Sequence, residues 1–470
     1  MLALAQATVE WTCGREKLVS RAQQSIDTVL EQHRMGTYRW GLYAACGVLM
    51  ALEGYDAYVV ANLAAVIARG LNIPIPSMGF VFTAQAAGMA LGYYTIPMLA
   101  DRIGRRNIII AGSALFGLLT LASTLATTLE HFMLVRFLAF LSLGGTLPNI
   151  VSLVAEFLPT VRRGRLLTWL FIAHGLGASI AGLFGPTIVA LHSWQAAFWA
   201  GGGLLLLFVP FLYLHLPESC RFLIMRDPAD VRIGRTLARV DPAFRIEPGT
   251  LFTTSEARPS GMPLVGLFRD GRAPMTLLLW LAMGSALCVT ATLSAWLPSY
   301  LHVLGGLDTA TATHMSAVSA FGAIAGPMLL TFMMKRLGMP ISLLLALLSG
   351  FFAMSLLALV GGMPWLGWVL GLSFGLLVIG AQAGLNSLVA SSYPTAIRST
   401  GIGWAGGIGR VTSMVGPGLG GAMLAAGWGP WEIYPAIASP LLLAALAMLI
   451  LHWTGAARET AVEPAPAAAA

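Results

Sequence analysis

The segment Ser152-Leu-Val-Ala-Glu-Phe-Leu-Pro159-Thr160 returns 235 residues later as Ser387-Leu-Val-Ala-Ser-Ser-Tyr-Pro394-Thr395. At the same offset Arg163 matches Arg398 and Trp169 matches Trp404, and at an offset of 234 Arg102-Ile-Gly104 matches Arg336-Leu-Gly338. Several matches at nearly one offset, about half of the 470 residues, indicate an internal duplication. The sequence therefore predicts two related halves.

The composition places these halves in a membrane. Hydrophobic residues make up 57% of the chain and charged residues 10%, whereas soluble domains contain roughly 45–50% and 25%. Apolar stretches of about 20 residues predict helices that cross a bilayer, rather than the shorter alternating strands of a barrel. We therefore expect an all-α membrane protein, and we exclude a soluble, disordered or coiled-coil chain.

Twelve transmembrane helices are expected, in two pseudo-symmetric six-helix halves. Their limits are 40–64, 77–99, 107–128, 132–157, 166–190, 195–214, 274–301, 311–334, 340–361, 364–392, 399–427 and 431–453. The predicted domains are a cytoplasmic segment 1–39 with an amphipathic helix, the bundles 40–214 and 274–454, a cytoplasmic linker 215–273 and a disordered cytoplasmic tail 455–470. Duplicated halves of this kind bind cargo at the midplane and expose it to each side in turn.

Basic residues are distributed unevenly between the two sides of the predicted spans. If both termini lie inside, 24 of the 27 Lys and Arg residues fall in inner segments and only Arg69 in an outer loop. Positive residues favour the cytoplasmic side. We therefore expect both termini in the cytoplasm and a place in a bacterial inner membrane. The same bias explains the net charge of +7 without nucleic acid.

Two acids stand inside the first span, where a charge costs at least a few kcal/mol and needs a partner or a task. Glu53 and Asp56 are three residues apart and share one helix face. Two carboxylates in a low-dielectric cavity repel each other, so one of them can take and release a proton. Proton or substrate coupling is therefore expected, and the alternative is an ion pair with Arg that only fixes helix packing.

Two arginines lie within the other spans. Arg136 has a depth similar to that of Asp56, so these two can pair, with a structural or a gating role, and Arg136 is also a candidate for substrate binding. Arg410 lies near the midplane of the eleventh span, and its half contains no intramembrane acid. Arg410 therefore either pairs across the cavity with Glu53 or Asp56 or binds an anionic substrate, for which its fork of donors suits a carboxylate. We favour the second reading.

Further polar and aromatic side chains are weaker candidates for substrate contact. The polar ones have hydrogen bonding between helices as their alternative, and the tryptophans have packing or interface anchoring. These candidates are His174, Gln382, Asn386, Asn149, Trp296 and Trp404. The cysteines Cys13, Cys46, Cys220 and Cys288 lack metal-ligand spacing, so neither a metal nor another cofactor is expected.

The loop Asp101-Arg102-Ile-Gly104-Arg105-Arg106 resembles the signature of the major facilitator superfamily, although Pro97 replaces the glycine that opens it. Glu53-Gly54-Tyr55-Asp56 resembles the D-G-Y-D motif of one of its branches, the aromatic acid:proton symporters. Other stretches similar to that branch are Pro148-Asn149, Glu156, Arg162-Arg163-Gly164, Leu216-Pro217-Glu218-Ser219, Arg221-Phe222-Leu223, Gln382-Ala-Gly-Leu-Asn386, Tyr393-Pro394-Thr395-Ala-Ile-Arg398, Gly403-Trp404 and Gly409-Arg410. The resemblance covers about 40–455.

The resemblance implies uptake of an aromatic carboxylate, such as a hydroxybenzoate, driven by inward proton flow. Asp56 and Glu53 would serve coupling and binding, and Arg410 and Arg398 would be the important arginines of the second half. The inner gate would be latched by Asp101 at the start of the eleventh helix, by an Arg105–Glu156 pair, and by Arg102, Gly104 and Arg106. Three departures concern the site: Glu53 stands for the first Asp, and Phe140 and Ser142 stand where the family usually has glycines.

Two alternatives remain open from the sequence. One is a transporter of a sugar, of a non-aromatic acid or of a drug by proton antiport, because the Pro-Glu-Ser stretch after the sixth span also occurs in sugar porters. The first-span acids and the midplane arginine suit an anion better. The other is a receptor without transport, which the lack of a soluble output domain disfavours. An enzyme is not expected, because no nucleophile–base pair or metal cluster is visible.

Overall fold

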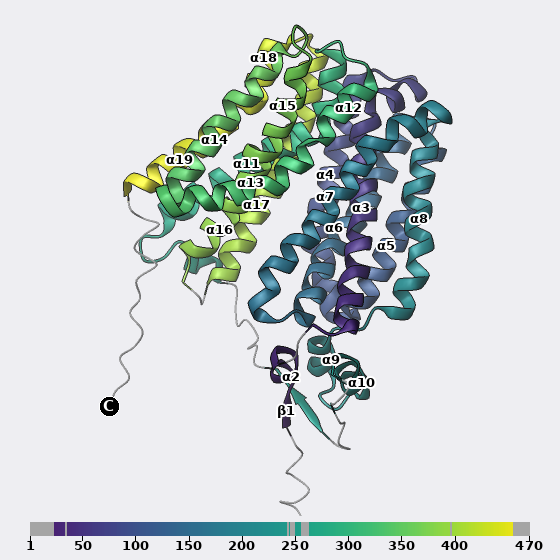
Figure 1. Cartoon of the computed structure of the whole chain (residues 1–470), viewed down its shortest axis with the longest axis vertical. Coiled ribbons are helices and arrows are strands. Elements are labelled where there is room, and N and C mark those ends of the chain that lie inside the picture. Colours follow the sequence, from purple (N-terminus) through teal and green to yellow (C-terminus); the bar gives the residue numbers. More distant parts are fainter. Residues whose placement is uncertain are drawn as a thin grey trace, which may run out of the picture.

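The computed structural model describes residues 23–32, 35–241, 244, 250–254, 263–394 and 397–454. Figure 1 shows two helical bundles side by side, one built from the first half of the chain and the other from the second. Among the described residues, ten helical segments are long and apolar enough to cross a membrane. Most of the polypeptide is therefore helical, as the sequence predicts.

The N-terminal bundle coincides with the first six expected spans. Short 3-10 turns η1 (Ile75–Ser77) and η2 (Ser123–Leu125) lie beside its loops. Its helices are α3 (Thr37–Gly70), α4 (Met78–Ile103), α5 (Arg105–Ala122), α6 (Leu129–Phe157), α7 (Thr160–Leu191) and α8 (Trp194–His215).

The C-terminal bundle follows the other six expected spans, but several of its helices are interrupted. Pro440 has no N–H to continue the ladder, and the helix breaks just before it. The elements are η3 (Pro263–Leu267), α11 (Ala273–Val303), α12 (Thr309–Ala317), α13 (Ser319–Leu337), α14 (Met339–Ser355), η4 (Leu356–Leu359), α15 (Trp365–Ser373), the π-helix η5 (Phe374–Ile379), α16 (Gly380–Ser392), α17 (Arg398–Ala425), α18 (Pro430–Ala438) and α19 (Pro440–Thr454).

A small appendage lies below the N-terminal bundle in Figure 1. Strand β1 (Gln23–Ser25) pairs in parallel with β2 (Leu251–Thr253), and Gln24 is opposite Phe252. The all-α expectation missed this sheet, because three-residue strands carry no periodic signal and their partners are far apart in the chain.

Three short helices complete the appendage: α2 (Ile26–Gln32), α9 (Cys220–Arg226) and α10 (Val231–Val240). Arg221 in α9 forms an ion pair of 3.6 Å with Asp27 in α2. Helix α2 lies within the segment 1–39 for which an amphipathic helix is expected, and residues 1–22 of that segment lie outside the described residues. The predicted tail 455–470 also lies outside them.

Glycines allow the helices of the N-terminal bundle to approach closely. A Cβ on Gly177 of α7 would lie 1.8 Å from the carbonyl oxygen of Ala51 in α3, and one on Gly54 would lie 2.0 Å from the carbonyl oxygen of His174. Lipid provides no hydrophobic force between helices, so such close backbone contact is the main source of their association.

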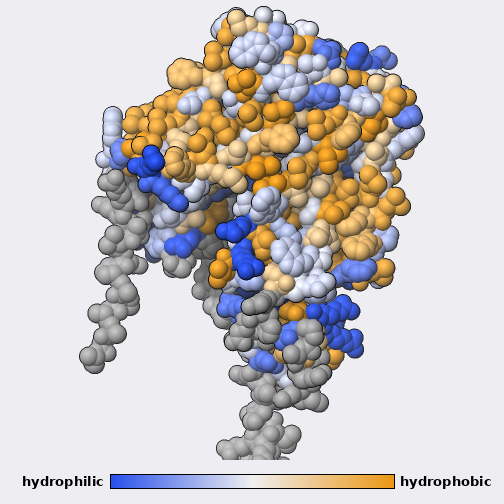
Figure 2. Space-filling view, viewed as in Figure 1, coloured by the Kyte–Doolittle hydropathy of each residue, from blue (hydrophilic) through white to orange (hydrophobic). Residues whose placement is uncertain are grey.

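The two bundles touch at one end and separate toward the other. At the closed end, the Thr313 hydroxyl of α12 donates to the Asn62 carbonyl oxygen of α3 over 3.2 Å. Gly421 of α17 lies against Pro76 and Gly79 of the other bundle. Figure 2 shows the surface hollowed between the bundles on the opposite side, the side of the appendage.

We predict that Gly177→Val destabilises the protein strongly, because the added side chain would collide with the rigid backbone of α3. The expected loss is about 1–3 kcal/mol or more, measured as a lower thermal unfolding midpoint in detergent micelles. Gly175→Val is the matched control, since it places the same residue in the same helix where nothing lies within 4 Å. Equal midpoints for the two variants would contradict the packing argument.

Candidate functional site

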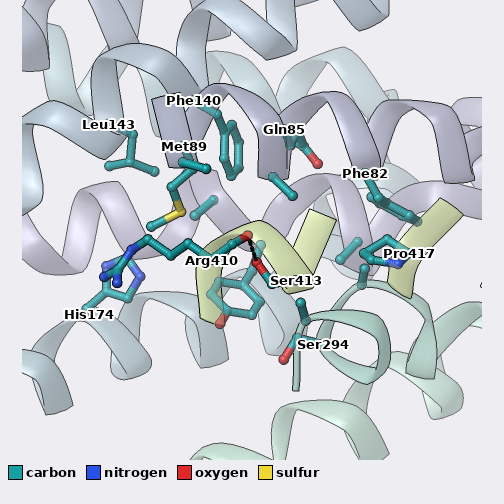
Figure 3. A pocket seen from close by; sticks show the side chains of 17 residues that line it. Phe82, Gln85, Met89, Phe140, Leu143, His174, Ser294, Arg410, Ser413 and Pro417 are labelled. Carbon is teal, nitrogen blue, oxygen red and sulfur yellow. Dashed lines mark hydrogen bonds between the residues drawn. The ribbon is translucent and has the colours of Figure 1, made fainter. Parts of the chain in front are cut away.

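A cavity of about 200 Å³ lies between the two bundles (Figure 3). Helices α3, α4, α6 and α7 form one wall, and α11 and α17 form the other. The lining residues are Ala57, Tyr58, Ala61, Phe82, Gln85, Ala86, Met89, Ala90, Phe140, Leu143, His174, Ala291, Ser294, Ala295, Arg410, Ser413 and Pro417. Most of these side chains are apolar, so a bound molecule would meet few, well-separated polar groups.

Arg410 is the positively charged side chain among the residues that line the cavity. Its guanidinium carbon lies 3.5 Å from the centre of the Tyr93 ring, which comes from α4 in the opposite bundle. Its Nη1 donates to the carbonyl oxygen of Gly406, one turn earlier in α17, over 3.2 Å. Within the described part of the chain no acid forms an ion pair with Arg410. Arg410 can therefore bind an anion that enters the cavity.

His174 adds a second polar group to the wall. Its Nδ1 lies 3.2 Å from the carbonyl oxygen of Met50, and because a carbonyl only accepts, this nitrogen carries the proton. The neutral ring then has its acceptor at Nε2. The Tyr58 ring contacts the imidazole edge-on at 6.3 Å between centres. Together these groups can exchange hydrogen bonds with a hydroxyl group of a ligand.

The two predicted acids do not line the cavity. Glu53 and Asp56 are fully buried inside the N-terminal bundle. The Ser113 hydroxyl of α5 donates to Glu53 Oε1 over 3.1 Å. Asp56 lies against Gly201 of α8, and among the described residues neither of its carboxylate oxygens has a hydrogen-bond partner. A ligand in the cavity therefore does not contact these carboxylates directly.

Arg136 is buried beside Asp56, but the contact runs through the backbone. Its Nη2 donates to the Asp56 carbonyl oxygen over 3.2 Å. Its guanidinium carbon lies over the rings of Phe140 and Phe198, at 5.2 and 5.6 Å. Gln85, oriented so that both groups are satisfied, accepts from Nε at 3.1 Å and from Nη2 at 3.2 Å.

Six of the predicted substrate contacts, Arg136 among them, lie outside the lining of the cavity. Trp296 is fully buried and donates to the Pro417 carbonyl oxygen over 2.8 Å. Asn149 donates to Gly145 of its own helix, and the amide of Gln382 contacts the sulfur of Met283. Trp404 stacks on the ring of Trp280, and Asn386 is exposed. The contacts of Trp296 and Trp404 match the packing alternative given above.

The sequence reasoning missed several lining residues. Phe82, Gln85 and Met89 recur at intervals of three and four in α4, so they lie on one helix face. That spacing is the signal that could have found them. Tyr58 follows Gly54 by four residues, about one turn of helix, and lies on a different face from Asp56. Phe140, noted as a departure from the family pattern, does line the cavity.

The loop between α4 and α5 forms a compact polar cluster. Arg105 makes an ion pair with Glu156 of α6, which also accepts from the Ser219 hydroxyl. Glu218 accepts from the backbone N–H of Arg106 over 3.0 Å, at the N-terminus of α5, where the helix dipole favours an anion. Gly104 has φ of +104°, and a side chain there would collide with the Glu218 carboxylate.

The remaining predicted gating residues are less constrained. Asp101 and Arg102 are exposed, and Asp101 makes no ion pair within the ranges that the structure describes. Arg398 donates through Nε to the Tyr393 carbonyl oxygen over 3.3 Å. Burial raises the pKa of the nearby Cys220 thiol, so that side chain remains a neutral packing group. No cluster of His, Cys, Asp and Glu that could hold a metal occurs in the described ranges.

Curated proteins similar to this chain along most of its length are named as transporters of aromatic acids. The 4-hydroxybenzoate transporter PcaK of Pseudomonas aeruginosa is 29% identical and covers 90% of this chain and 95% of its own. The gallate transporter of Pseudomonas putida is 31% identical and covers 89% of this chain and 93% of its own. The 3-(3-hydroxy-phenyl)propionate transporter of Escherichia coli is 33% identical over 86% and 92%.

Solved structures agree on the fold. The partially occluded inward-open xylose transporter XylE from E. coli superposes with a TM-score of 0.67 at 16% identity, covering 89% of this chain and 99% of its own. A bacterial homologue of the human lysosomal transporter Spinster, inward-facing and occupied, gives 0.65 at 16% identity, covering 92% and 100%. The model of the Major Facilitator Superfamily matches residues 46–417. The chain is thus an integral, multi-pass membrane protein and not an enzyme, and it belongs to the Major Facilitator Superfamily.

Proposed function

We propose that this protein imports an aromatic carboxylate together with protons, as a symporter that works by alternating access. The observation that supports this most directly is Arg410, a cation without an acid partner among the described residues, in a largely apolar cavity. Its fork of donors fits a carboxylate, and the apolar wall with Tyr58, Phe82 and Phe140 fits a ring. The named cargoes of the relatives, 4-hydroxybenzoate, gallate and 3-(3-hydroxyphenyl)propionate, combine these two features.

The helices support a transporter of twelve spans in two related halves. Ten segments are apolar enough by hydropathy alone, and α4 and α17 fall on the two other expected spans. The appendage lies on the side where the cavity opens (Figures 1 and 2), and α9 and α10 belong to the arginine-rich linker. With both termini in the cytoplasm of a bacterial cell, this conformation is open to the inside.

Asp56 and Glu53 are the proposed proton carriers. Both are sealed from water and lipid, so each is costly as an anion unless a cation is near. Arg136 is that cation for Asp56, although its guanidinium donates to the backbone rather than to the carboxylate. Such an arrangement suits a neutral Asp56. Protonation outside and release inside would then accompany the passage of the substrate.

The loop cluster is the proposed inner gate. The Arg105–Glu156 pair and Glu218 join α5, α6 and the linker into one unit inside the N-terminal bundle. Asp101 is exposed and unpaired in the described ranges while the cavity is open on this side. In the outward-open state Asp101 would meet the start of α17, near Arg398, and hold the inner side closed, with Arg102 beside it.

A panel of labelled substrates in proteoliposomes tests the function as a whole. With an inward proton gradient, 4-hydroxybenzoate and benzoate should accumulate, sugars should not, and substrate addition should cause proton uptake. Accumulation of sugars but not of benzoates would replace the proposal by that of a sugar porter. Binding of benzoates without accumulation would favour a receptor.

We predict that Arg410→Lys raises the KM for 4-hydroxybenzoate at least about tenfold, because a point charge cannot replace two parallel hydrogen bonds. Uptake rates against substrate concentration provide the measurement. Arg336→Lys is the control, since its guanidinium lies over the ring of Phe332, away from the cavity, 4.8 Å from the ring centre. An unaltered KM in Arg410→Lys would remove Arg410 as the anion site.

Asp56→Asn should abolish proton-driven accumulation while leaving the protein inserted and able to exchange substrate across the membrane. The amide is nearly isosteric with a protonated carboxyl group but cannot release a proton. Accumulation and counterflow are measured on the same vesicles, with Glu130→Gln, an exposed acid at the start of α6, as the control. Normal accumulation by Asp56→Asn would refute its role in coupling.

A further inference from the structure

The coupling of substrate to protons needs a connection that direct contact does not provide. The cavity holds Arg410, while Asp56 lies behind its wall, inside the N-terminal bundle. Gln85 of α4 belongs to both environments. It lines the cavity, and its amide oxygen accepts from the Arg136 guanidinium at 3.1 and 3.2 Å.

We propose that Gln85 is a positioning residue that links occupation of the cavity to the protonation of Asp56 through Arg136. The inference rests on the proposed proton-coupled transport. Glu53, Asp56 and Arg410 cannot take this role. Gln85 can, because its side chain lines the cavity and is also hydrogen-bonded to Arg136.

The orientation of the amide follows from this contact. Because Arg136 offers only donors, the Gln85 oxygen must face it, and the N–H groups of the amide are left for other partners. In Figure 3 Gln85 lies on the Phe82 side of the cavity, away from the end at which Arg410 approaches His174. A ligand oxygen at the far end from Arg410 could accept from these N–H groups.

The Arg136 guanidinium, which only donates, contacts both Asp56 and Gln85 and, among the described residues, still has an unused donor group. Its Nη2 already serves the Asp56 carbonyl oxygen, and its Nη1 has no partner within the described ranges. An ionised Asp56 carboxylate would draw the guanidinium toward itself and away from Gln85. A protonated Asp56 leaves the guanidinium on Gln85, which keeps the amide oriented for the ligand.

The consequence is positive coupling between proton and substrate. Protonation of Asp56 improves substrate binding, and by linkage the bound substrate favours protonated Asp56 to the same degree. That sign is the one a symporter requires. The titratable groups around Asp56 are Glu53 and Tyr55 on α3 and Arg136 on α6, whereas α5 presents Ser113 and Thr120 and α8 presents Gly201.

The test measures the affinity for 4-hydroxybenzoate at two pH values. Asp56 is protonated at the lower one and has released its proton at the higher one. In the wild type the affinity should fall as the pH rises. Gln85→Leu should weaken binding at the lower pH about fivefold, the value of one hydrogen bond, and should remove the dependence on pH. Every other group of the cavity, His174 included, is unchanged between the two proteins, so the difference between them isolates Gln85.

Met89→Leu is the matched control, because Met89 lines the cavity from the next turn of α4 and has no polar contact with Arg136. It should keep the pH dependence of the wild type. A purely structural role of Gln85 would lower the affinity of Gln85→Leu by one factor at both pH values. The inference would be overturned by that uniform loss, in which Gln85→Leu keeps the wild-type ratio between its affinities at the lower and the higher pH.

A double-mutant cycle supplies the second measurement. In an Asp56→Asn background the neutral side chain mimics the protonated state, so Gln85→Leu should lower the affinity by the full factor at both pH values. If the two substitutions acted independently, Gln85→Leu would cost the same at the higher pH with or without Asp56→Asn. If the wild type binds no 4-hydroxybenzoate at all, the proposed function fails as well; if it binds independently of pH, only the inference fails.

Discussion

The complete burial of the Arg136 guanidinium constrains the whole N-terminal bundle. A permanent cation removed from water requires oxygen acceptors and polarizable surfaces around it. The bundle supplies them from several helices: the Asp56 carbonyl of α3, the Gln85 amide of α4, and the rings of Phe140 and Phe198. Helices tied to one guanidinium in this way form one unit, as the proposed alternating access requires of each half.

This arrangement divides the charges between two compartments. The acids are inside one bundle, where they are sealed from the cavity, and the free cation Arg410 is inside the cavity, where it meets Tyr93 of the opposite bundle. A cavity that contained both would satisfy Arg410 internally and would leave little attraction for an anion. The separation would keep the proposed proton site and the proposed anion site from neutralising each other.

Much of the fold was predictable from the sequence, because apolar length and basic-residue bias are strong signals for membrane helices. Glu53, Asp56, Arg136 and Arg410 could be selected for the same reason: a charge is conspicuous in an apolar segment. Their grouping could not be predicted, because helix rotation decides which face meets the cavity. Gln85 escaped notice since a single uncharged amide is common in such helices, and the β1–β2 pair joins residues more than two hundred positions apart.

The helices α4 and α17 connect these points. Both coincide with expected spans, but among the described helices they are not in the set of ten that are apolar enough to be candidate spans. Both also line the cavity, α4 with Gln85 and Met89 and α17 with Arg410 and Ser413. They also touch each other across the bundles, where Gly421 lies against Gly79 and Arg410 against Tyr93. The polar and glycine residues that reduce their hydropathy include those that line the cavity and those that lie where the two bundles touch. In a helix that faces a water-filled pathway for part of each cycle, a weak membrane signal is the expected result of its task.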